Sequence, residues 1–164
     1  MAETTFTGPI KAGNVLQSDG TGSLASSGGY NGTANVGYAV MAQSENITQA
    51  TNGSSAGVYT TSIVIPADSQ ILSITLLVST AWTGVASTLG IGTTASATAL
   101  TAAGAVAGGT KGIVSANPGT VDAAIANWKD VGATDIQVKV TSTNTGSGVG
   151  VLTVTYIQSN SLTA

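Results

Sequence analysis

The sequence predicts an all-β protein: an antiparallel β-sandwich, jelly-roll-like, with one short helix and an extended N-terminal arm. Composition is the first reason. Thr, Ser, Gly and Asn are abundant and only 4% of the residues are aromatic, a mixture that suits pleated strands and tight turns. The second reason is that short segments of alternating apolar and polar residues follow one another without a strand–helix–strand rhythm. An immunoglobulin-like sandwich is the alternative to the jelly roll.

Residues 1–35 and 36–164 are predicted to form two different parts. The first part is rich in Gly, Ser, Thr and Asn, contains turn signals such as Asn31-Gly32, and shows no helical or strand spacing. We expect an arm that becomes ordered by docking on another surface, and a disordered leader is the alternative. The second part is long enough to bury one core without disulfides or metals. The candidate docking residues of the arm are Phe6, Ile10, Lys11, Val15, Leu16, Leu24 and Tyr30.

The strand predictions rest on apolar residues at every second position. Residues 70–79 give the clearest pattern, and a hairpin through residues 82–84 is expected to pair this strand with the next one. A Gly-rich turn at residues 144–150 is expected to close a second hairpin. The residues of the clearest strand that should share one face are Leu72, Ile74, Leu76 and Val78. The predicted strands are residues 36–40, 58–65, 70–79, 87–92, 136–141 and 152–156.

One short helix is predicted between residues 120 and 132, after a low-complexity stretch at residues 93–119 that should contain short strands and loops. Thr120 is the expected cap, Asp122 lies in the first turn, Lys129 lies in the last turn and Gly132 should end the helix. The apolar residues at helical spacing are Val121, Ala124, Ile125 and Trp128.

Charged residues are few: seven acidic residues and four lysines, with no histidine, arginine or cysteine. General acid–base catalysis near neutral pH uses histidine or carboxylates with shifted pKa values, so we expect a scaffold and no enzyme. Nucleic acid and anionic membranes attract clustered basic residues, and a net charge of −3 without such a cluster predicts neither partner. No signal peptide or membrane span is predicted, and the lack of cysteine leaves the compartment open.

Three patterns that resemble ligand sites are interpreted as structural. Residues 90–95 match G-x-G-x-x-A, but no βαβ unit is predicted around them, so no nucleotide cofactor is expected. The glycine-rich residues 104–112 lack the order of a phosphate-binding loop. Asp122, Asp130 and Asp135 could share a calcium ion, but they lack the EF-hand spacing, and no metal is expected.

Five stretches resemble the small head decoration, or cement, proteins of tailed bacteriophages, particularly those of marine and cyanobacterial phages. They are TTFTGPIKAG at 4–13, IPADSQILSI at 65–74, TAWTG at 80–84, STLGIG at 87–92 and GVGVLTVTYIQ at 148–158. The resemblance implies a jelly-roll-like domain, often homotrimeric, on the outer face of a phage head, where it ties neighbouring major capsid protein subunits together. No catalytic residue is implied. Residues 93–119 do not align with the family, which leaves a trimer contact there open.

The expected function is therefore that of a structural virion protein, made in the host cytoplasm, that decorates and stabilises the capsid. Its expected partners are the major capsid protein, through the arm, and further copies of itself in a homotrimer. The alternative is a phage fibre or tail-tip module that binds host surface glycans. In that case Tyr59, Trp82 or Trp128 would be exposed and would stack on sugar rings.

Overall fold

The computed structural model describes residues 39–50, 52, 57–84, 87–142 and 144–158. The predicted arm and all seven of its candidate docking residues lie outside this part of the chain. Within it there are eight strands and one helix. They are β1 (Ala39–Thr48), β2 (Val58–Ile65), β3 (Ser69–Thr80), β4 (Thr88–Thr93), β5 (Val106–Ala107), β6 (Gly112–Ala116), α1 (Asp122–Lys129), β7 (Ile136–Ser142) and β8 (Val149–Gln158).

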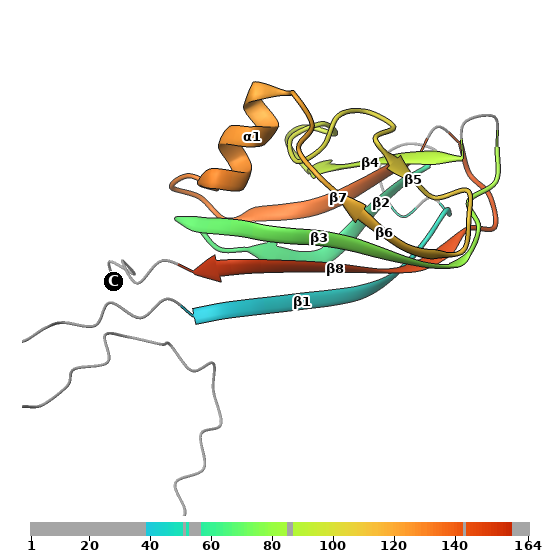
Figure 1. Ribbon diagram of the computed structural model, residues 1–164, viewed down its shortest axis with the longest axis horizontal. Helices are drawn as coiled ribbons and strands as arrows, with labels where there is room; N and C mark the ends of the chain where they lie inside the picture. The colour runs from blue at the N-terminus through green and yellow to red at the C-terminus, as the bar shows by residue number, and fades with distance from the viewer. Residues whose placement is uncertain (1–38, 51, 53–56, 85–86, 143, 159–164) are drawn as a thin grey trace, which may run out of the picture. The chain divides into compact units, whose positions relative to one another are not determined.

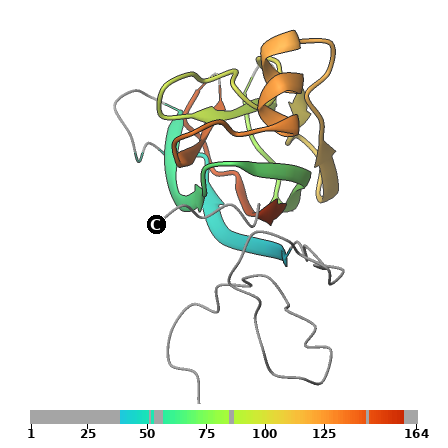
Figure 2. The ribbon, with the colours of Figure 1, turned by 90° about the vertical axis from the view of Figure 1, so that its left-hand side faces the viewer.

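The strands form two antiparallel sheets that pack face to face (Figures 1 and 2). The first sheet has the order β1-β8-β3-β6, and the second sheet has the order β2-β7-β4-β5. Except for β4 and β5, each strand lies in the opposite sheet from the strand that follows it in sequence. This is the strand order of a jelly roll, in which the chain crosses repeatedly between the layers. The predicted all-β sandwich is confirmed, and the immunoglobulin-like alternative does not apply.

Both predicted hairpins are wrong. β3 pairs with β6 and β8, and β4 pairs with β5 and β7, so residues 82–84 carry the chain from one sheet to the other. The turn before β8 crosses in the same way, because β7 belongs to the second sheet and β8 to the first. The first crossing contains Trp82, whose side chain is 2% exposed. A Cβ atom on Gly148 would lie 2.5 Å from its indole ring, so the ring packs against bare backbone where the chain crosses.

A bulge in β3 changes which residues face the core. The pairing of β3 with β8 shifts register between Ile71 and Ser73. A bulge adds one residue to one strand and so reverses the alternation of faces beyond it. Ile71 is buried on one side of the bulge and Ile74 on the other, and Leu72 is 44% exposed. The predicted shared face is therefore confirmed for Ile74, Leu76 and Val78 and is wrong for Leu72.

The helix α1 lies at one end of the sandwich, near the start of β3 (Figure 2). Trp128 on this helix donates a hydrogen bond from its indole Nε1 to the carbonyl oxygen of Leu100 at 2.8 Å. This bond ties the helix to the loop after β4. Ala124 is fully buried, but Ile125 is 44% exposed, contrary to the predicted apolar face. The predicted Thr120 cap is also wrong, because the N-cap is Val121 and no side chain caps it.

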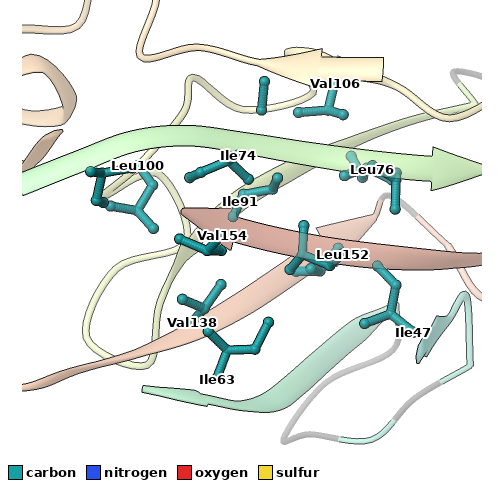
Figure 3. Packing of buried hydrophobic residues seen from close by; sticks show 14 of the residues in the cluster. Ile47, Ile63, Ile74, Leu76, Ile91, Leu100, Val106, Val138, Leu152 and Val154 are labelled. Atoms are coloured by element: carbon teal, nitrogen blue, oxygen red, sulfur yellow. The ribbon is translucent and has the colours of Figure 1, made fainter. Parts of the chain in front are cut away.

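The core is aliphatic, as the composition predicts. Side chains from the inward faces of both sheets interdigitate between the layers, as in other sandwiches. Two large rings, Trp82 and Tyr156, are each 2% exposed and join this cluster. Representative core residues, drawn in Figure 3, are Ile47, Ile63, Ile74, Leu76, Ile91, Leu100, Val106, Val138, Leu152 and Val154.

Candidate interaction surface

The outward side of β4 in the second sheet is covered by the protein's own chain (Figure 1). A Cβ atom on Gly92 would lie 2.3 Å from the carbonyl oxygen of Ser96, so the loop after β4 rests directly on the strand backbone. Thr101 in this loop is fully buried. Its Oγ1 accepts a hydrogen bond from the backbone N–H of Ile91 at 2.8 Å, and its own N–H donates to the Ile91 carbonyl oxygen at 2.9 Å. Because Leu89 and Ile91 belong to the core and the loop covers the other side, all of β4 from Leu89 to Thr93 is buried.

The free edge of β2 is closed by side chains of β1. Glu45 Oε2 accepts hydrogen bonds from both the N–H and the hydroxyl of Ser62, each at 2.6 Å. The amide of Gln43 bonds the N–H and the carbonyl oxygen of Val64, and its Nε2 also donates to the Tyr156 hydroxyl at 2.8 Å. These two side chains take the place of a neighbouring strand.

The outward face of the first sheet has no comparable cover among the described residues. Three of its strands present apolar side chains side by side. Leu77 on β3 lies opposite Ile113 on β6 and opposite Val151 on β8. Ile113 is 75% exposed and Leu77 46% exposed, and Val149, two positions before Val151 on the same strand face, is 36% exposed. We call these four residues, Ile113, Leu77, Val149 and Val151, the apolar row.

A row of hydroxyl groups runs beside the apolar row. Thr75 lies opposite Ser115 on one side and Thr153 on the other. The Ser44 hydroxyl lies 3.0 Å from the Thr153 hydroxyl, so the row continues onto the edge strand β1. The hydroxyl row thus crosses all four strands with Ser115, Thr75, Thr153 and Ser44. Hydroxyl groups can both donate and accept, so they can satisfy a polar partner without introducing a charge.

No charged residue of the described chain occupies an outward position on this face. Glu45 lies on β1 but bonds Ser62 of the other sheet, and Lys139 lies on β7 of the second sheet. Lys111 immediately precedes β6 and marks the rim. The charged residues that the structure describes are Glu45, Asp68, Lys111, Asp122, Lys129, Asp130, Asp135 and Lys139. The face is therefore neutral and partly apolar, which is the character of the centre of protein interfaces.

The residues considered for other sites are not arranged for them. Trp82 is buried and cannot stack on a sugar ring. Trp128 is half-buried and bonded to Leu100, and the half-buried Tyr59 bonds the Asn46 carbonyl oxygen at 3.3 Å. Gly90 and Gly92 lie inside β4, which is followed by the covering loop and not by the helix of a dinucleotide site.

Two of the three acidic residues considered for calcium bind backbone N–H groups, one in its own turn and one in the loop between β2 and β3. Asp130 Oδ1 accepts a hydrogen bond from the N–H of Gly132, and Asp135 Oδ1 accepts one from the N–H of Ala67, both at 2.9 Å. No group of three potential metal ligands occurs in the described ranges.

A hollow of about 140 Å³ lies beside the outward side of β4. Thr88, Gly90, Thr98 and Thr141 are among its lining residues, and no charged side chain lines it. The hollow offers hydroxyl groups but no general acid or base.

Among the helices that the structure describes, none has the length and apolar content needed to cross a membrane.

The neutral outward face of the first sheet was not among the predicted features. It could have been found from the absence of charge in residues 69–80, 112–116 and 149–158, which form three adjacent strands. Recognising that they are adjacent needs the jelly-roll pairing, which the hairpin prediction did not contain.

No protein-family model and no curated protein matches the chain. Among solved structures, the chain is similar to a chain of the structure described as "Cyanophage Pam1 capsid asymmetric unit". The two sequences are 24% identical, the alignment covers 87% of this chain and 97% of the other chain, and the TM-score is 0.42.

Proposed function

We propose that this protein is a non-enzymatic structural component of a tailed-phage virion that decorates and stabilises the outer surface of the capsid. The observation that carries the proposal is the outward face of the first sheet, which has no charged residue on its strands and is lined by the apolar row and the hydroxyl row. Such a face suits contacts with other folded proteins, because the centres of protein interfaces are depleted in charge. The sequence resemblance to head decoration proteins favours a phage head as the assembly.

In this proposal the protein binds in two ways. Residues 1–35 form an arm that docks on the major capsid protein, and the sandwich forms a homotrimer with further copies. Each contact can be weak, because a copy held at one point keeps its other contacts at a high effective concentration. Symmetry then repeats the contacts over the shell. The proposed docking residues are Phe6, Ile10, Lys11, Val15, Leu16, Leu24 and Tyr30.

The test is co-sedimentation of the purified full-length protein with phage heads that lack it. We expect binding by the wild type and an approximately tenfold or greater loss of affinity for the triple variant Phe6→Ser, Ile10→Ser, Leu16→Ser, since loss of interface anchors commonly has such an effect. The matched control is Val64→Ser with Ile125→Ser, which changes exposed apolar residues of the sandwich that lie outside the apolar row.

Two results would contradict the proposal at different levels. Unchanged binding by the triple arm variant would remove the arm from the docking contact. Failure of the wild type to bind heads, together with binding to host surface glycans, would instead favour the fibre or tail-tip alternative.

A further inference from the structure

We infer that the apolar row is the contact between copies of this chain. This inference deepens the proposed function, because it assigns a surface to the proposed homo-oligomer and leaves the capsid contact to the arm. The partner that covers the row is a second copy of this chain.

The exposure and the register of the row are the first observations. Ile113 keeps 75% of its surface exposed, and its neighbour Leu77 keeps 46%. The pairing places these side chains and Val151 next to one another on adjacent strands, so they form a continuous strip and not scattered apolar residues. Continuous apolar strips on an otherwise polar surface mark interaction sites.

The charge distribution favours an identical partner. Each copy carries a net charge of −3, and contacts between identical surfaces that contain Asp122, Asp130 or Asp135 would bring like charges together. Like charges in apposition disfavour an interface. The strands of the first sheet contribute no charged side chain to its outward face, and only Lys111 lies at the rim beside β6. The centre of this face therefore allows two copies to meet without repulsion.

Size and position also fit. The four strands β1, β8, β3 and β6 have 10, 10, 12 and 5 residues. Spaced about 4.8 Å apart, they present a face of about 600 Å², and two such faces together approach the area of a standard specific interface. The row runs to β6, an edge strand of the sheet. A rotation axis beside this edge would bring Ile113 of each copy next to its equivalent, as cyclic oligomers do with residues near the axis.

The experiment compares the full-length wild type with Ile113→Asp and Leu77→Asp by analytical ultracentrifugation over a range of concentrations. We expect the wild type to be oligomeric and each variant to dissociate at least about tenfold more readily. The matched control is Ile125→Asp, because Ile125 on α1 is 44% exposed, close to the value for Leu77, but lies outside the row. The control should sediment as the wild type does.

A second set of variants separates loss of contact from loss of folding. Ile113→Thr and Leu77→Thr place neutral, β-branched residues on the strands. The double variant should also weaken the oligomer, while its circular dichroism and its thermal transition, measured at monomeric concentration, match those of the control. A monomeric wild type, an oligomer that survives both Asp variants, or equal disruption by Ile125→Asp would overturn the inference.

The triple arm variant tests whether the arm, and not a second copy of the domain, binds the apolar row. If Phe6→Ser, Ile10→Ser, Leu16→Ser dissociates the oligomer while the row is intact, the arm occupies the row and the inference is wrong. Head binding is measured separately on the same proteins. A wild type that is oligomeric through the row but does not bind heads would contradict the proposed function and leave this inference standing.

Discussion

The two sheets have the same number of strands and share one core, but their outward faces differ. On the second sheet, Gly90 and Gly92 leave the backbone of β4 open, and the loop after β4 packs onto it. On the first sheet, the equivalent outward positions carry side chains such as Leu77 and Thr75, and no described segment covers them. Glycine at alternate positions thus marks a face that the chain covers itself. Neutral side chains at those positions leave the face of the first sheet without such a cover among the described residues.

The largest effect is expected when a side chain is added under the covering loop. Gly92→Ala should lower the free energy of unfolding by about 3 kcal/mol, because the new Cβ would overlap the backbone of Ser96 and Ala97. Gly90→Ala is the matched control, since its Cβ would meet its nearest neighbours at 3.6 Å, an ordinary contact. Equilibrium denaturation at one fixed protein concentration measures both. Equal effects at the two glycines would mean that the loop does not rest on β4 as described.

A smaller effect is expected at the buried side-chain amide of the residue that follows β1. Gln49 is 2% exposed, and its Oε1 accepts hydrogen bonds from the N–H groups of Thr83 at 2.8 Å and Gly148 at 3.2 Å. Gln49→Leu should cost about 2 kcal/mol of unfolding free energy, because a buried donor loses its partner. Gln70→Leu on the outward face of the first sheet should change the free energy of unfolding by less than about 0.5 kcal/mol. A neutral result at Gln49 would show that these two crossing loops are held by other contacts.

The smallest effects are expected when one hydroxyl group is removed, either under the loop that covers β4 or on the outward face of the first sheet. Thr101→Val removes the Oγ1 that accepts from the Ile91 N–H and should cost about 1.5 kcal/mol. Thr75→Val makes the same change in the hydroxyl row and should stay within about 0.5 kcal/mol, because that hydroxyl is open to water and valine suits a strand. Thermal and urea unfolding of the two variants measure both changes in the free energy of unfolding. A larger loss of stability for Thr75→Val than for Thr101→Val would mean that the outward face of the first sheet itself contributes to the stability of the domain.

The local elements could largely be predicted from the sequence. β2 has the predicted bounds, β3 extends the predicted range by one residue at each end, and α1 lies within its predicted range. These segments have strong alternation or helical spacing, and the core needs only apolar residues at those positions. The buried residues of β8, Leu152, Val154 and Tyr156, are those that the pattern indicates.

The pairing of strands could not be predicted in this way. Alternation shows that a segment is a strand but does not identify its partner, and a turn after a strand looks similar whether it closes a hairpin or crosses to the other sheet.

Most of β1 was missed for a different reason. Gln43 and Glu45 on β1, and Gln49 directly after it, are polar because they bind backbone of β2 and of two loops. The pattern therefore does not show the usual apolar alternation.

The candidate surface depended on this missing information. Ile113, Leu77 and Val151 are far apart in sequence and become neighbours only through the pairing of β3 with β6 and β8. The seven proposed docking residues of the arm, by contrast, were chosen from local sequence and lie outside the described residues, so their role stays a prediction.

The side chains that close the edge of β2 have a further consequence. An open strand edge invites edge-to-edge polymerisation, because its free amides can template another chain and the added chain offers a new edge in turn. Glu45 and Gln43 occupy the amides of Ser62 and Val64 before any neighbour can reach them. However densely such molecules are crowded together, strand addition along these amides is blocked, which guards against fibril-like growth from this side.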